Sequence, residues 1–147
     1  MKEICTKIII NASPIVVWNI ITDFENFGKW NPFIKKISGV PKEGNTIQIF
    51  IKPPNSNGMR FEPKILKYEP EKEIRWLGKL WIPKIFDGEH SLTIRKVDEN
   101  KILFIQKEQF KGLLIPLFTN MLEDTKSGFI IMNEKLKQKA EEMMEEM

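Results

Sequence analysis

The hydrophobic pattern of the last part of the chain predicts one long helix, from Leu113 to Met147. Apolar or small residues recur there at steps of three or four positions, at Leu114, Phe118, Met121, Thr125, Phe129, Met132, Leu136, Ala140 and Met143. These steps keep one stripe facing one way. Glu123 and Asp124 lie off the stripe, and we expect them to begin the exposed face. A stripe this long needs a broad apolar surface, so we expect the helix to pack on a sheet.

The segments ahead of this helix have the alternating pattern of strands. Ile4, Ile8 and Ile10 give the segment Lys2 to Asn11 one well-buried face. Further strands are predicted over Phe33 to Val40, Asn45 to Lys52, Met59 to Tyr68, Glu73 to Leu80, Gly88 to Val97 and Lys101 to Lys111. Turns containing Gly, Pro, Asn or Asp separate most of them, which predicts consecutive hairpins.

Two short helices are predicted between the first and second strands. Ser13 is a good N-cap, and Pro14 suits the first helical position because its missing N–H leaves no donor unpaired there. We expect a helix over Ile15 to Thr22 and a second over Phe24 to Lys29. The predicted fold class is therefore α+β, with a single domain over residues 1–147.

Charge and composition exclude several classes of function. The 23 basic and 20 acidic side chains leave a net charge of +3, too balanced for a nucleic-acid-binding face. One Cys and one His cannot form a Cys/His metal cluster, so we expect no metal and no cofactor. No uncharged run of 18 residues occurs, which argues against stable membrane insertion, and we expect a cytoplasmic protein.

A resemblance to a known superfamily rests on motifs spread over nearly the whole chain. They are Ser13-Pro14, Val17-Trp18 and Trp30-Asn31-Pro32 early on, then Phe86-Asp87-Gly88-Glu89-His90, Gln106, Glu108, Phe110, Gly112-Leu113-Leu114, Pro116, Gly128-Phe129 and Met132-Asn133-Glu134. The sequence resembles the START-related superfamily, also called SRPBCC, in its polyketide cyclase/dehydrase-like branch. This resemblance implies a helix-grip fold, in which a curved seven-stranded antiparallel sheet wraps the last helix around a hydrophobic cavity. The superfamily holds carriers, sensors, co-chaperone domains and some enzymes, so fold does not fix function.

The last hairpin predicts a polar patch on the inner face of the sheet. If Val97 opposes Lys101, then Ile94 faces Phe104, Leu92 faces Gln106 and His90 faces Glu108. The apolar members mark this face as the inner one. His90, Gln106 and Glu108 either satisfy one another or orient a ligand. Glu108 can hold His90 protonated, or fix its tautomer so that the other ring nitrogen meets the ligand.

Large apolar side chains are predicted to surround this patch. The candidate ligand-binding residues are Phe61, Trp76, His90, Leu92, Phe104, Gln106, Glu108, Phe110, Phe118, Met121, Leu122 and Thr125. Aromatic and Met side chains at these spacings also suit a plain core. The loops Pro53 to Gly58 and Trp81 to Asp87, with the start of the last helix, are the candidate mouth.

We expect the protein to bind a small hydrophobic or amphipathic molecule, such as a lipid, a polyketide-like compound or an aromatic compound. One alternative is an enzyme of the cyclase/dehydrase kind, with His90 as general acid or base and Glu108 orienting it. Another is a protein-interaction domain of the co-chaperone type. The sequence is compatible with a monomer or a homodimer.

Overall fold

The computed structural model describes residues 2–54, 57–79, 87–112 and 115–147. In chain order its elements are β1 (Lys2–Ile10), α1 (Pro14–Thr22), η1 (Phe24–Asn26), α2 (Phe27–Trp30), β2 (Ile34–Ser38), β3 (Gln48–Ile51), β4 (Met59–Phe61), β5 (Lys64–Glu69), β6 (Glu73–Lys79), β7 (Asp87–Asp98), β8 (Lys101–Lys111), η2 (Ile115–Phe118) and α3 (Thr119–Glu145). The predicted class, α+β with antiparallel sheets and a long C-terminal helix, is confirmed.

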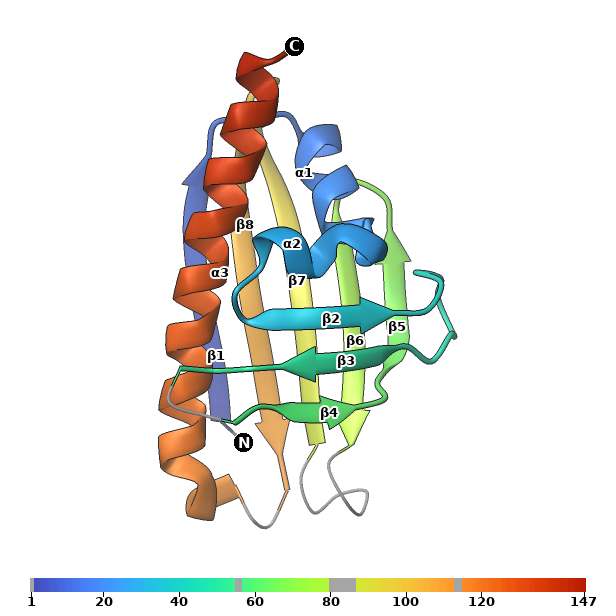
Figure 1. Ribbon diagram of the computed structural model, residues 1–147, viewed down its shortest axis with the longest axis vertical. Helices are drawn as coiled ribbons and strands as arrows, with labels where there is room; N and C mark the ends of the chain where they lie inside the picture. Colours follow the sequence, from blue (N-terminus) through green and yellow to red (C-terminus); the bar gives the residue numbers. More distant parts are fainter. Residues whose placement is uncertain (1, 55–56, 80–86, 113–114) are drawn as a thin grey trace.

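The strands form two sheets, so the prediction of a single seven-stranded sheet is wrong. One sheet has the order β1-β8-β7-β6-β5 and the other β2-β3-β4, and every pairing is antiparallel. Figure 1 shows β2, β3 and β4 running across the longer strands of the first sheet. This arrangement gives the fold a second wall that the sequence did not predict.

The break between the sheets occurs at Pro63, inside the segment predicted as one strand. Proline has no N–H to donate to a ladder and is found at strand ends and edges. The chain therefore pairs up to Phe61 with β3 and from Lys64 onward with β6. Backbone hydrogen bonds from Ile47 N to the Pro63 carbonyl, 2.9 Å, and from Ile65 N to the Asn45 carbonyl, 2.8 Å, still join the two sheets.

The long helix begins later than predicted. The η2 turn contains Pro116, and α3 starts at Thr119; Leu113 and Leu114, predicted as its first residues, lie outside the described residues. The predicted stripe is buried at Thr125, Phe129, Met132, Leu136 and Ala140. Figure 1 shows α3 lying along β1 at one side of the sheet. No helix within the described residues is long and apolar enough to cross a membrane.

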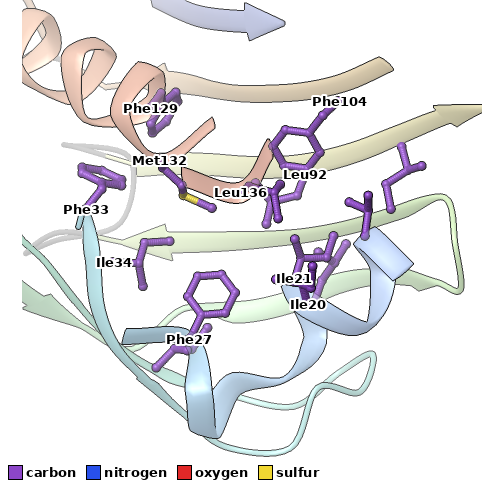
Figure 2. Close-up of a cluster of buried hydrophobic side chains, with 14 of the residues drawn as sticks. Ile20, Ile21, Phe27, Phe33, Ile34, Leu92, Phe104, Phe129, Met132 and Leu136 are labelled. Carbon is purple, nitrogen blue, oxygen red and sulfur yellow. The ribbon is translucent and has the colours of Figure 1, made fainter. Parts of the chain in front are cut away.

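The predicted helix start at Ser13 is confirmed, since its Oγ accepts from the backbone N–H of Val16 at 3.4 Å. Helix α1 then closes the core from the side opposite the start of α3. Figure 2 shows apolar side chains from α1, α3, β7 and β8 meeting in one cluster, among them Ile20, Ile21, Phe27, Phe33, Ile34, Leu92, Phe104, Phe129, Met132 and Leu136. These buried side chains form the hydrophobic core.

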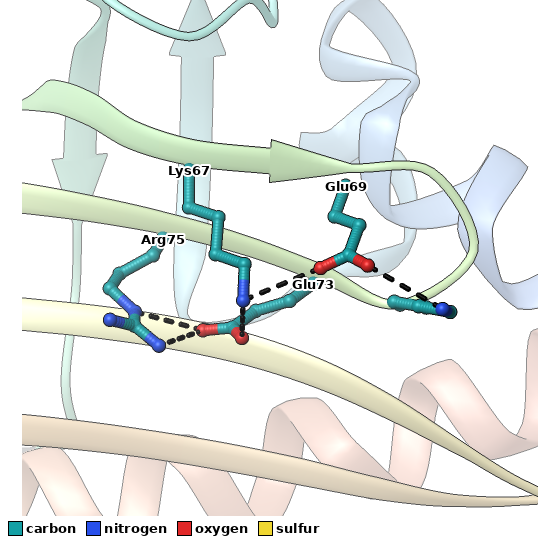
Figure 3. Close-up of polar contacts among 5 residues, drawn as sticks. Lys67, Glu69, Glu73 and Arg75 are labelled. Carbon is teal, nitrogen blue, oxygen red and sulfur yellow. Dashed lines mark hydrogen bonds and ion pairs between the residues drawn. The ribbon is translucent and has the colours of Figure 1, made fainter.

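A cluster of charged side chains lies on β5 and β6, as Figure 3 shows. Arg75 donates to Oε2 of Glu73 from Nε at 2.8 Å and from Nη2 at 2.6 Å, and Lys67 Nζ donates to Oε1 at 3.1 Å. Burial would raise the pKa of Glu73, but the hydrogen bonds from Lys67 and Arg75 outweigh it and the pKa lies below its ordinary value. The hydrogen bond with Glu73, its negative charge and the contact with Glu69 raise the pKa of Lys67.

Replacing Glu73 with glutamine is expected to lower the free energy of unfolding by about 1 kcal/mol near neutral pH. Because the folded pKa of Glu73 is lowered, its stabilisation is present above the ordinary value of 4.5 and is lost as pH falls through the folded value. The difference between wild type and Glu73→Gln should therefore shrink on acidification, measured by urea unfolding across the acid range. Glu69→Gln, at a more exposed position of the same cluster, is the control. A difference that stays constant down to the lowest pH would contradict this.

Candidate functional site

A cavity of about 270 Å³ opens between the two sheets and the first turns of α3. The described residues lining it are Phe33, Ile51, Pro53, Met59, Phe61, Gly78, Gly88, His90, Glu108, Phe110, Met121, Asp124 and Thr125. Most of these are apolar. The polar groups lie on β7, β8 and α3, so the cavity has one polar side and a largely apolar opposite wall.

Two glycines shape this cavity. Gly78 and Gly88 are paired across β6 and β7, two residues beyond the pair formed by Trp76 and His90, so both continue the inward-facing alternation of their strands. A Cβ on Gly88 would meet Glu108 and Phe110 only at ordinary contact distance, 3.5 and 3.6 Å, so the space beside Gly88 is open. A Cβ on Gly78 would lie 3.1 Å from Cδ2 of Phe61, so Gly78 lets the Phe61 ring pack directly against β6.

Two local features fix Phe33 in the cavity wall. The Oδ1 of Asn31 accepts from the backbone N–H groups of Phe33 and Ile34, both at 2.9 Å, which sets the start of β2. A Cβ on Gly128 would lie 2.3 Å from Cδ1 of Phe33, so only a glycine lets the ring lie directly against α3. The ring also contacts Phe129 edge to face, with centroids 5.5 Å apart.

The predicted pairing of the last hairpin agrees with the structure at the polar patch. His90 faces Glu108, Leu92 faces Gln106 and Ile94 faces Phe104. The register shifts by one residue between Lys96 and Asp98, so Lys101 pairs with Asp98 and the predicted pair of Val97 with Lys101 is wrong. This bulge at the turn leaves the pairs farther along the hairpin unchanged.

A chain of hydrogen bonds runs inward from the cavity through buried side chains. His90 Nε2 lies 2.9 Å from Gln106 Oε1, and Gln106 Nε2 donates to Asn133 Oδ1 at 2.7 Å. Asn133 Nδ2 then donates to Thr6 Oγ1 at 2.9 Å, and this hydroxyl donates to the Gln106 carbonyl at 3.2 Å. All four residues are less than 10% exposed. The chain ties β1, β7, β8 and α3 together.

The direction of these bonds fixes the His90 ring nitrogen that donates. The Phe129 carbonyl lies 3.5 Å from Gln106 Nε2, and a carbonyl only accepts, which orients the amide with Oε1 toward His90. Nε2 of His90 therefore carries a hydrogen. Of the two roles predicted for Glu108, the one that leaves a ring nitrogen of His90 for a ligand does not fit, because Nε2 is engaged by Gln106 and Nδ1 faces Glu108.

His90 and Glu108 face each other beside the cavity. Nδ1 of His90 and Oε1 of Glu108 are 3.3 Å apart. The second carboxyl oxygen of Glu108, Oε2, lies 3.5 Å from the point where Gly88 would carry a Cβ, so it faces the cavity.

Rings on both sides hold His90 in place. Its centroid is 5.0 Å from that of Trp76 and 4.9 Å from that of Phe129. Its side chain is only 5% exposed, against 14% for Glu108. Of the two, Glu108 is the group more accessible to a molecule in the cavity.

The structure divides the predicted ligand-binding residues into two groups. Phe61, His90, Glu108, Phe110, Met121 and Thr125 line the cavity. Trp76, Leu92, Phe104, Gln106 and Leu122 are buried in the core around it and do not reach the lining. The side chain of Phe118 and the loop segment from Leu80 to Phe86 lie outside the described residues.

Asp124 is the main correction to the predicted site. We expected it on the exposed face of the long helix, yet it is half-buried and lines the cavity beside Thr125. It lies one position before Thr125 and three after Met121, at the edge of the apolar stripe. Pro53, the first residue of the loop predicted as part of the mouth, lines the cavity. The crossing sheet also supplies Ile51 and Met59, which have no signal in the helix or hairpin patterns.

Asn133 is an inward-facing polar residue that was not among the predicted site residues. It directly follows Met132 of the stripe, and its side chain is 3% exposed with two hydrogen bonds. Within the described residues, no group of His, Cys, Asp and Glu side chains could hold a metal ion. The buried polar side chains beside the cavity form hydrogen bonds with one another.

Solved structures with the same fold cover almost the whole chain. A START superfamily protein from Mycobacterium smegmatis is 15% identical, with a TM-score of 0.73, over 96% of this chain and 98% of that one. A point mutant of norcoclaurine synthase from Thalictrum flavum, solved with a transition-state analogue, is 12% identical, with a TM-score of 0.73, over 97% and 96%. The Aha1 dimer from Colwellia psychrerythraea is 21% identical, with a TM-score of 0.73, over 95% and 96%.

The TM-scores show that the chain shares its fold with these proteins, and identities of 12–21% show nothing beyond the fold. The relatives include an enzyme and a protein described as a dimer, so the fold alone does not choose among their activities. Among curated proteins, none matches the chain. A family model described as polyketide cyclase/dehydrase and lipid transport matches residues 1–141, and the chain therefore belongs to that family.

Proposed function

We propose that this protein, as a single ligand-binding domain over residues 1–147, binds a small hydrophobic or amphipathic molecule in the cavity between its two sheets and α3. The observation that carries the proposal is the missing side chain at Gly88, which leaves a largely apolar space beside Glu108 and His90. Membership of the family supports it, because that family is described by cyclase, dehydrase and lipid-transport members. The ligand is a lipid fragment, a polyketide-like compound or an aromatic compound.

The size and lining of the cavity support a compact ligand. Its volume of about 270 Å³ lies just below the range of about 300–1,000 Å³ typical of sites for drug-sized ligands. Phe33, Phe61 and Phe110 supply aromatic surface, and Met121 supplies an adaptable apolar contact. The body of the ligand lies against these groups, with its polar end toward Glu108.

The same geometry bears on the alternative that the protein is a cyclase/dehydrase-like enzyme. Glu108 lies 3.3 Å from His90 Nδ1 through one oxygen and turns its second oxygen toward the cavity, which is where an acid or base would be needed. In that case Glu108 is the candidate to touch the substrate, and His90 would position it. Catalysis would still begin with binding in this cavity, so binding is the first property to test.

Replacing Gly88 with valine is expected to weaken binding of a neutral hydrophobic probe at least about tenfold. The added side chain would project into the cavity beside Glu108 and Phe110, while its Cβ makes only ordinary contacts. Valine also suits a strand, so the fold should be preserved. Titration with N-phenyl-1-naphthylamine, followed by the rise in probe fluorescence, measures the affinity.

Glu89→Val is the matched control, because it adds the same side chain to the neighbouring position on the outward face of β7. It should leave probe affinity unchanged. Equal affinity of Gly88→Val and wild type, with both proteins folded by circular dichroism, would show that the probe binds elsewhere and would overturn the proposal.

A further inference from the structure

The charges lining the cavity differ in sign from the charge of the whole chain. The ionisable side chains among the described lining residues are His90, Glu108 and Asp124. None is Lys or Arg, although the chain carries 23 of these and a net charge of +3. Two of the lining side chains, Glu108 and Asp124, are carboxylic side chains. The described part of the lining is therefore acidic in character, inside a chain of net positive charge.

Glu108 presents an acceptor oxygen to the cavity. Its Oε1 lies against His90, and its Oε2 faces the cavity. Within the described residues Oε2 has no hydrogen-bond partner, while Oε1 is occupied by His90. A ligand group placed opposite Oε2 must therefore be a donor.

Asp124 adds an uncompensated charge to the same wall. Its side chain is half-buried at the cavity, and no basic side chain forms an ion pair with it in the described part of the chain. Glu123, its neighbour on α3, is exposed to solvent instead. Charge interactions strengthen where water is displaced, so Asp124 acts more strongly on a molecule in the cavity than an exposed carboxylate would.

The apolar wall is compatible with the same kind of ligand. Aromatic faces carry a negative quadrupole and attract organic cations. Phe33, Phe61 and Phe110 line the cavity and can contact either the apolar body of a cation or its charged group. An anionic ligand would be repelled by the carboxylate of Asp124, and the described lining residues include no Lys or Arg to pair with the ligand.

We infer that the ligand of this cavity is a compact hydrophobic amine, bound as the ammonium cation. Its N–H groups donate to Oε2 of Glu108, and Asp124 supplies the balancing charge. This inference rests on the proposed function, since it assigns the chemical class of the molecule held in the same cavity. It excludes fatty acids and other carboxylates as preferred ligands.

The test compares three probes that share one body and differ only in the polar end. They are 2-(1-naphthyl)ethylamine, 2-(1-naphthyl)ethanol and 3-(1-naphthyl)propanoate, titrated into the full chain by isothermal calorimetry near neutral pH. We expect the amine to bind about fivefold more tightly than the alcohol, because it adds a partly buried ion pair. The propanoate should bind at least about tenfold more weakly than the alcohol.

A pair of neighbouring variants on α3 isolates the effect of Asp124. Asp124→Asn should reduce the affinity for the amine to that for the alcohol and leave the alcohol unchanged. Glu123→Gln removes the same charge from the adjacent exposed position, so it is the control for long-range electrostatics and should preserve the preference for the amine. Neither substitution touches the contact between His90 and Glu108, so both variants should fold.

The outcomes distinguish failure of the amine assignment from failure of the proposed function. Equal binding of the three probes, or tightest binding of the propanoate, would overturn the assignment of an amine and leave hydrophobic binding intact. Loss of the preference in both variants would overturn the role of Asp124. No binding of any probe, together with no binding of N-phenyl-1-naphthylamine, would overturn the proposed function itself and the amine with it.

Discussion

Replacing Phe129 with alanine is expected to lower the free energy of unfolding by about 3–5 kcal/mol. Phe129 is fully buried, and its ring contacts Phe33, the residue before β2, and His90 on β7. Truncation removes the apolar contacts and leaves a void between α3 and both sheets, which the neighbouring rings cannot fill without moving. The loss should appear as a lower midpoint in guanidinium unfolding.

Ile130→Ala is the control for this prediction, since it truncates the next residue of α3 at a position 48% exposed. It should cost less than about 1 kcal/mol. Because the void would open next to the cavity, Phe129→Ala should also weaken binding of the naphthyl probes by removing the support of Phe33 and His90. A loss of stability no larger than that of Ile130→Ala would show that the rings do not pack as described.

Replacing Gln106 with leucine is expected to destabilise the protein by about 2–4 kcal/mol. Gln106 is fully buried and is the link between His90 and Asn133. Without its amide, the Nε2 hydrogen of His90 and the Oδ1 of Asn133 lose their partners in the interior, and each unpaired group costs desolvation energy. Urea unfolding near neutral pH measures the effect.

A double-mutant cycle with Asn133→Leu separates the network from simple loss of packing. Asn133→Leu alone should also destabilise, because Gln106 Nε2 and Thr6 lose a partner. The double variant removes both members of the contact, so its loss should be smaller than the sum of the two single losses by about 1 kcal/mol or more. Strict additivity would mean that Gln106 and Asn133 do not interact as the structure shows.

The last hairpin was predictable because its pattern is local. Inward-facing residues alternate on both arms, and a short turn limits the possible registers, so the contact of His90 with Glu108 follows from counting. The bulge at the turn was not predictable from the alternation. The bulge changed only the pair nearest the turn, because burial of the inner face fixes the register of the other pairs.

The crossing sheet was not predictable, although its breaking point was visible as Pro63. A proline says that a strand ends, but not which neighbour the next segment joins. The order β2-β3-β4 depends on how far the long strands curve and on where α3 lies, which are properties of the whole fold. For the same reason, no local pattern predicted that Ile51 and Met59 line the cavity.

The roles of Asp124 and Asn133 were missed for a geometric reason. A helical stripe has edges, and a residue there turns inward or outward according to the shape of the surface that it meets. Asp124 lies at such an edge and turns toward the cavity, whereas Asn133 turns toward Gln106 on β8. Both assignments need the position of the opposite wall.

The pairing of the first strand with the last one has a consequence for how the chain acquires its structure. Thr6 and Gln106 are 100 residues apart, yet they share a hydrogen bond, and all of β1 pairs with β8. Hairpins such as β5 with β6 and β7 with β8 close short loops and can form early, whereas joining β1 to β8 closes a loop of about 100 residues. Folding should therefore be slow for the size of the protein. On the ribosome, β1 stays unpaired until β8 has emerged, which exposes an apolar strand for most of synthesis.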